Sequence, residues 1–144
     1  MDERLKTRRM RLPDRLTKPS EFLRITKKGA RYRQNFLTVY IARALETGAG
    51  GGSGRVGFII TGHAVKGSAK RNRIRRLLRE AVRKWWGLIK PGFDIVLKAG
   101  ASPNIDHADY VERTFITGCL AAGILTEQGT VEAEGFLNRE AGSK

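Results

Sequence analysis

The clearest hydrophobic pattern in the chain has the period of an α-helix. Between Ser68 and about Gly87, apolar residues recur three or four positions apart: Ile74, Leu77, Leu78, Ala81, Val82 and Trp85. This spacing places their side chains on one helical face. Ser68 is a candidate N-cap, and the Pro91-Gly92 pair would stop any continuation of the helix. The pattern therefore predicts a long amphipathic helix in the middle of the chain.

Two shorter segments also have helical patterns. In the segment Pro19–Lys28 the proline suits the first turn and Gly29 suits a left-handed exit. Its expected buried side comprises Phe22, Leu23 and Ile25. A last helix is expected to begin at Asp109, because Asp109 and Glu112 have the spacing of a capping box. Its core-facing residues would be Val111, Phe115, Cys119 and Ala122.

Three further segments alternate as β-strands do and are rich in β-branched and aromatic residues: Phe36–Arg43, Arg55–Thr61 and Phe93–Lys98. A run of glycines at 48–54 predicts a loose connection between the first two. The resulting order α-β-β-α-β-α predicts a single α+β domain with helices packed on a sheet. We expect a basic flexible arm at 1–14, the domain at 15–124 and a flexible tail at 125–144.

Charge adds to this picture because it is both large and uneven. The chain holds 28 Lys and Arg against 14 Asp and Glu residues, a net charge of +14. Residues 1–100 carry 25 basic and 7 acidic side chains, whereas residues 101–144 carry 3 and 7. Such a field attracts polyanions, of which nucleic acid is the commonest. No apolar run is long enough to cross a bilayer, and a single cysteine, Cys119, fits a reducing cytoplasm.

The predicted helix at 68–87 concentrates positive charge on one side. At 100° per residue, one arc beside the apolar face contains no acid and holds Arg71, Asn72, Arg75, Arg76, Arg79 and Arg83. We call this set the arginine arc. Arginine binds two phosphate oxygens with its planar fork, and the first helical turn adds unpaired N–H groups. Glu80 falls outside the arc, where it can pair with Arg76 or Lys84.

The segment Lys70–Glu80, KRNRIRRLLRE, resembles the Arg-Asn-Arg motif of the bacterial ribonuclease P protein family. The resemblance covers about residues 15–124 and includes RLTKPSEFLRITKKG (15–29), FLTVYIA (36–42), RVGFII (55–60) and KPGFDIVLKAG (90–100). It implies an α/β sandwich with a mixed sheet and a left-handed β-α-β crossover, against the usual hand of such units. It also implies a subunit that assists a catalytic RNA in the Mg²⁺-dependent removal of the 5′ leader from precursor tRNA.

By this likeness, two sets of residues would bind RNA. The RNA subunit would be contacted by Lys66, Lys70, Arg71, Asn72, Arg73, Arg75, Arg76 and Arg79. The single-stranded leader would lie in a cleft between the first helix and the sheet, against Arg15, Lys18, Phe22, Thr38 and Tyr40. Aromatic faces beside cations suit single-stranded nucleic acid.

Two positions depart from the family pattern. Thr26 stands where many relatives have a second aromatic, and Thr61-Gly62-His63 stands where relatives tend to have two lysines. Lys66 is a candidate to replace that missing charge. Tyr40 shares a strand face with Thr38, which favours an accessible cleft wall, whereas Phe22 suits either the cleft or ordinary core packing.

Nothing in the sequence predicts a catalytic side chain or a metal site built by the protein itself. His63, His107 and Cys119 lack the spacing of metal ligands, so Mg²⁺ is expected to act with the RNA subunit. The expected partners are the ribonuclease P RNA and precursor tRNA in the cytoplasm, without DNA or membrane. The alternatives are a general RNA-binding or ribosomal protein, and a DNA-binding domain with 68–87 as its recognition helix.

Overall fold

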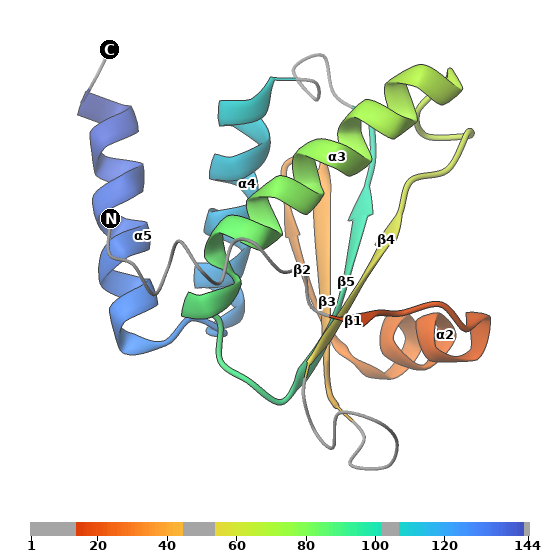
Figure 1. Cartoon of the computed structure of the whole chain (residues 1–144), viewed down its shortest axis with the longest axis horizontal. Helices are drawn as coiled ribbons and strands as arrows, with labels where there is room; N and C mark the ends of the chain where they lie inside the picture. Colours follow the sequence, from red (N-terminus) through yellow and green to blue (C-terminus); the bar gives the residue numbers. More distant parts are fainter. Residues whose placement is uncertain (1–13, 45–53, 102–106, 143–144) are drawn as a thin grey trace.

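The computed structural model describes residues 14–44, 54–101 and 107–142 of the chain. Residues 1–13 of the predicted arm and most of the predicted glycine-rich connection lie outside these ranges. The elements in Figure 1 follow in the order β1 (Asp14–Arg15), α2 (Pro19–Lys28), β2 (Ala30–Gln34), β3 (Leu37–Arg43), β4 (Arg55–Ile59), α3 (Ser68–Trp85), a 3-10 turn (Trp86–Leu88), β5 (Phe93–Ala99), α4 (Ala108–Ala122) and α5 (Glu127–Gly142). The three predicted helices and three predicted strands are all present.

The five strands form one mixed sheet in the order β1-β4-β5-β3-β2. Strand β4 is parallel to β1 and β5, whereas β3 is antiparallel to both of its neighbours. Helix α2 lies on one face, and α3 and α4 cover the other, with α5 beyond α4 (Figure 1). This arrangement confirms the predicted α+β class. The chain passes from β4 through α3 to the neighbouring parallel strand β5, the β-α-β unit for which the family resemblance implies a left-handed crossover.

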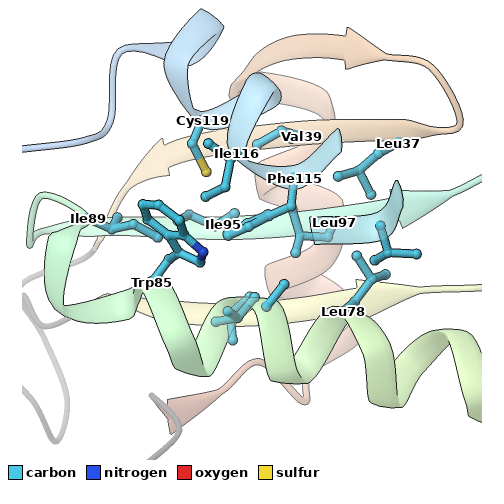
Figure 2. Packing of buried hydrophobic residues seen from close by; sticks show 14 of the residues in the cluster. Leu37, Val39, Leu78, Trp85, Ile89, Ile95, Leu97, Phe115, Ile116 and Cys119 are labelled. Atoms are coloured by element: carbon cyan, nitrogen blue, oxygen red, sulfur yellow. The ribbon is translucent and has the colours of Figure 1, made fainter. Parts of the chain in front are cut away.

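The main hydrophobic core lies between the sheet and the helices α3 and α4 (Figure 2). Its most buried side chains alternate along β3 and β5 and recur along the helices: Leu37, Val39, Ile95, Leu97, Ile74, Leu78, Phe115 and Ile116. Each such side chain contributes about 1.5–3 kcal/mol through its burial. The predicted apolar face of α3 is confirmed, since five of its six residues are buried and Leu77 packs against them. Cys119 also lies in this core, where burial raises the pKa of its thiol.

Helix α5 stands where a flexible tail was expected, and for most of its length that expectation is wrong. Ala133 is completely buried, and the ring of Phe136 meets Trp85 edge-on at 5.7 Å between centroids. Two glycines in its interior, Gly129 and Gly135, lower the helix propensity of this segment, so the helix was not predicted. One of them has a packing role: a Cβ on Gly129 would lie 2.4 Å from the carbonyl oxygen of Leu88. The hydroxyl of Thr126 accepts a hydrogen bond from the Gly129 N–H at 3.0 Å and caps the helix.

Strand β2, which was not predicted, pairs with β3 and forms one edge of the sheet. Its connection to β3 uses Asn35 with φ of 55°, a conformation that asparagine tolerates better than most residues. The left-handed exit expected at Gly29 is wrong, because this residue is extended, with φ of −79° and ψ of 165°. Gly29 leads directly into the new strand instead of into a loop.

Helix α2 contributes little apolar burial to the sheet face it covers. Ile25 is fully buried in a small cluster with Leu16, Tyr40 and Val96. Phe22 is half-buried, and Leu23, expected on the buried side, is 54% exposed. The helix therefore needs other contacts to hold its position.

Those contacts come from a buried carboxylate. Asp94 on β5 is completely buried and accepts hydrogen bonds from the Arg24 Nη2 at 2.7 Å and the Arg55 Nη2 at 3.0 Å. It also accepts the backbone N–H of Arg55 at 3.1 Å. Glu21 accepts from the same two guanidinium groups, at 2.9 and 3.1 Å. Two cations and two anions thus form a neutral network, a condition for burying charge at tolerable cost.

The network shifts the pKa values of Glu21 and Arg55. The hydrogen bond from Arg24 lowers the pKa of Glu21, with further help from the charges of both arginines, although partial burial opposes the shift. The hydrogen bond to Asp94 raises the pKa of Arg55. Ionised forms of both groups are therefore stabilised in the folded protein.

Asp94→Asn is expected to destabilise the protein. The amide keeps one acceptor oxygen but presents an N–H₂ group to two guanidinium groups and removes the central negative charge. We expect a loss of about 2–3 kcal/mol in the free energy of unfolding, below the range for a fully buried pair because both arginines retain some contact with water. Urea denaturation measures this loss. Asp109→Asn, at an exposed position of α4, is the control, and equal effects of the two changes would refute the structural role of the network.

Glu21→Gln should change how stability depends on pH. The pKa of Glu21 is lowered in the folded protein from its ordinary value of 4.5, so its carboxylate contributes stability that is complete above pH 4.5. This contribution is lost as pH falls through the lowered value. The stability difference between the unmodified protein and Glu21→Gln should thus be constant near neutral pH and shrink in acid. Urea denaturation over a pH series tests this, and a difference that grows in acid would contradict it.

Candidate nucleic-acid interface

The orientation of α3 is set by its apolar face, which packs on the sheet and α4. Gly67, with φ of 94°, is its N-cap, and Ser68 is the first helical residue, so the predicted Ser68 cap is wrong. With the apolar side buried, the arginine arc lies along the outer side of the helix. Asn72 and Arg76 are exposed, whereas the arginines at 71, 75, 79 and 83 are half-buried.

Several members of the arc are engaged within the protein. The Arg71 Nη1 donates to the carbonyl oxygen of Val65 at 3.0 Å, which ties α3 to the preceding loop. The Arg75 Nη1 donates to the Asn72 Oδ1 at 3.2 Å, so these two side chains form one donor-rich unit. Such contacts fix the guanidinium groups in place while leaving other N–H donors on the same groups.

The predicted partners of Glu80 are wrong. Glu80 accepts from Arg83 at 3.1 Å, three residues away, and not from Arg76 or Lys84 four residues away. Lys84 pairs instead with Glu112 of α4 at 3.0 Å. Glu112 also accepts a hydrogen bond from the Trp85 Nε1 at 2.7 Å, so it joins α4 to α3 and does not complete a capping box. The ion pair with Glu80 neutralises Arg83 at the C-terminal end of the arc.

The N-terminal half of α3 and the loop before it retain uncompensated positive charge. Lys66, Lys70 and Arg76 are exposed, and their side chains make no hydrogen bond or ion pair within the described part of the chain. The first turn of α3 contains no acidic residue. Free backbone N–H groups at a helix N-terminus add to this field. This half of the helix, which also carries Arg73, can therefore bind several phosphate oxygens.

The residues expected to bind the leader lie beside α2. The face of the sheet that α2 covers carries Thr38 and Tyr40 from β3, and Lys18 is exposed at the start of the helix. Phe22 packs directly on β4, where a Cβ on Gly57 would lie 2.6 Å from its ring. The side chain of Arg15 lies outside the described part of the structure. We call Lys18, Phe22, Thr38 and Tyr40 the α2 surface.

One expectation for the α2 surface needs revision. Tyr40 is only 9% exposed, because Leu16, Ile25 and Val96 pack around it, so it is largely a core residue and not an accessible wall. Thr26, at the position of the missing aromatic, donates its hydroxyl to the Phe22 carbonyl oxygen at 2.9 Å. The more accessible groups of this surface are therefore Thr38, the exposed part of Phe22 and the ammonium group of Lys18.

Lys98 is a further cation on this face that the motif comparison missed. It is exposed and lies directly opposite Thr38 in the register of β5 and β3. The alternation of β5 could have revealed it, because Val96 and Lys98 lie two residues apart and share one face of the sheet.

The described residues contain no group of three or more His, Cys, Asp or Glu side chains that could hold a metal ion. His63 and His107 are exposed in separate loops. Burial and the raised pKa of Cys119 make its thiol a poor nucleophile. None of the described helices is long and apolar enough to span a bilayer. The exposed cations beside α2 and along α3 suit the binding of anions.

Fold and surface together define a small basic α+β protein with exposed cations on both faces of its sheet. A family model described as Ribonuclease P matches residues 10–117. The ribonuclease P protein component of Chloroflexus aggregans is 34% identical over 101 residues, which cover 70% of each chain. That of Syntrophomonas wolfei is 32% identical over 111 residues, which cover 76% of this chain and 87% of the relative. The chain belongs to the ribonuclease P protein family, the protein components of an endoribonuclease that acts on precursor tRNA.

Solved structures agree with this assignment at the level of the fold. The ribonuclease P protein of Staphylococcus aureus superposes with a TM-score of 0.67 at 23% identity and covers 78% of this chain and 97% of its own. That of Thermotoga maritima has a TM-score of 0.60 at 23% identity, covering 72% and 93%. The family match decides against the alternatives of a ribosomal protein and a DNA-binding domain. Helix α5 lies beyond the part of the chain that the family model matches.

Proposed function

We propose that this protein binds the RNA subunit of ribonuclease P through α3 and the 5′ leader of precursor tRNA through the α2 surface. The cut itself is made by the RNA subunit with Mg²⁺. The observation that carries this proposal is a set of exposed cations, Lys66, Lys70 and Arg76, that runs from the loop before α3 to the middle of the helix. None of the three is paired with an acid in the described residues, and Lys66 and Lys70 lie beside the helix N-terminus. Because the chain belongs to the ribonuclease P protein family, the RNA expected on this surface is the ribonuclease P RNA subunit.

The two surfaces suit two different kinds of RNA. The arginine arc offers forked donors along a rigid helix, which fits the backbone of a structured RNA. The α2 surface offers a partly exposed ring, a hydroxyl and an ammonium group on the opposite face of the sheet, which fits an unpaired strand. A protein that holds both RNAs neutralises part of their mutual repulsion. The holoenzyme should then need less Mg²⁺ than the RNA subunit alone.

The first test of this proposal is cleavage of precursor tRNA at a series of Mg²⁺ concentrations. We expect the RNA subunit alone to need high Mg²⁺, and addition of the protein to shift the requirement to lower concentrations. Protein freed of RNA should cleave nothing. Cleavage by protein alone, or an unchanged Mg²⁺ requirement, would overturn the proposed division of labour.

The second test concerns α3. Arg76→Ala removes an exposed, unpaired guanidinium group, so it should weaken binding to the RNA subunit and reduce the log–log salt slope by roughly 0.9. Thermal stability should not change. Arg71→Ala should weaken binding and also lower stability, because Arg71 holds the carbonyl of Val65. Filter binding over a salt series, together with thermal unfolding, separates the two effects.

The matched control for this second test is Arg139→Ala. It removes the same charge from an exposed position of α5, which lies at the opposite end of the molecule from the N-terminal end of α3 (Figure 1). If Arg139→Ala and Arg76→Ala change the salt slope equally, net charge and not the arc is responsible for binding.

A further inference from the structure

The edge strand β2 carries two arginines on the sheet face that α2 partly covers. In the antiparallel register of β2 and β3, Arg31 lies opposite Tyr40 and Arg33 lies opposite Thr38. Directly opposite residues of an antiparallel pair project from the same face. Lys98, opposite Thr38 on the other side of β3, shares that face. We call Arg31, Arg33 and Lys98 the cation row.

The cation row is open and uncompensated. All three side chains are exposed, and none makes a hydrogen bond or ion pair within the described ranges of the chain. The acids of this face, Glu21 and Asp94, are already held by Arg24 and Arg55. Asp94 also lies four residues from Lys98 along β5, roughly 13 Å at the rise of a strand.

Helix α2 leaves this part of the sheet uncovered. From α2, Arg24 contacts Asp94 on β5, and the ring of Phe22 contacts Gly57 on β4. Thr38 and Ile59, which flank Lys98 in the register, are only half-buried. The cation row thus continues the α2 surface across β5 and β3 to the edge of the sheet, over two strand spacings of roughly 5 Å each.

We propose that the cation row binds phosphates of the single-stranded leader and extends its path from the α2 surface to the β2 edge. This inference rests on the proposed binding of the leader to the α2 surface and adds residues to it. A row of cations beside partly exposed apolar and aromatic groups suits the binding of single-stranded nucleic acid. The consequence is that longer leaders bind more tightly, because only they reach Arg31 and Arg33.

A second explanation for these arginines is protection of the sheet edge. Charged side chains on an edge strand discourage pairing with another chain. If this is their role, the protein should self-associate when the charges are removed. Any change in affinity should then be the same for substrates with and without a leader. Size-exclusion chromatography of the variants therefore accompanies the binding measurements.

The test uses holoenzyme with the RNA subunit saturated, at one salt and Mg²⁺ concentration. The substrates are mature tRNA and precursor tRNAs with leaders of about 2 and about 12 nucleotides, lengths below and within the range of single-strand sites. Arg31→Gln/Arg33→Gln should weaken binding of the long-leader substrate about fivefold. For the same substrate, the slope of the logarithm of the binding constant against the logarithm of the salt concentration should fall by about 1.4, because two phosphate contacts on a single strand are lost. Mature tRNA and the short-leader substrate should be bound as before.

The matched control is Lys90→Gln/Arg139→Gln, which removes two exposed charges outside the α2 surface and the cation row. It should not discriminate between leader lengths. Equal losses for all three substrates, or self-association as the sole effect, would overturn the role of the cation row in leader binding.

Lys18→Ala separates failure of this inference from failure of the proposed function. Lys18 belongs to the α2 surface and is exposed, so its loss should not disturb the core. If Lys18→Ala weakens binding of both leader-bearing substrates while the double arginine variant has no effect, leader binding stands and the extension is wrong. If neither variant distinguishes precursor from mature tRNA, the proposed leader binding fails as well.

Discussion

A single buried carboxylate determines where the first helix sits. Helix α2 buries only Ile25 completely, which is too little apolar surface to fix a helix of ten residues on a sheet. Asp94 supplies the missing constraint by accepting hydrogen bonds from Arg24 on the helix and Arg55 on β4. Because hydrogen bonds are directional, this arrangement sets both the distance and the orientation of α2 over the sheet. The relative positions of Lys18, Phe22 and Thr38 therefore depend on a network that contacts none of these side chains.

The sheet separates the two surfaces that we propose for RNA. Helix α3 packs on one face and α2 on the other, so each surface is backed by a different hydrophobic cluster. A structured RNA on α3 and an unpaired strand beside α2 could thus be bound together without competing for side chains. The arrangement also explains why the family motif, which lies entirely in α3, says little about residues on the opposite face.

Local periodicity was sufficient to predict most elements of the fold and the arginine arc, because both depend on neighbours three or four positions apart in a helix and two apart in a strand. Helix α5 was missed because Gly129 lowers helix propensity, although a close contact with Leu88 requires a glycine there. The Asp94 network was also missed. Glu21, Arg55 and Asp94 are far apart in sequence, and no periodicity relates them. For the same reason, the burial of Tyr40 and the hydrogen bond from Arg71 to the Val65 carbonyl oxygen could be established only in three dimensions.

The acidic side chains of helix α5 lie far from the basic end of the molecule, so positive and negative charge are separated along its long axis. Glu127, Glu132 and Glu134 are exposed on α5 at one end of the long axis, and α2 with its neighbouring cations lies toward the other end (Figure 1). In the field of a polyanion, such a molecule experiences a torque as well as an attraction. The torque would turn the basic end of the protein toward the polyanion before any contact forms. A larger fraction of the diffusional collisions would then begin in a productive orientation. The last helix would then influence the rate of encounter with RNA, although none of the residues that we propose for RNA binding lies on it.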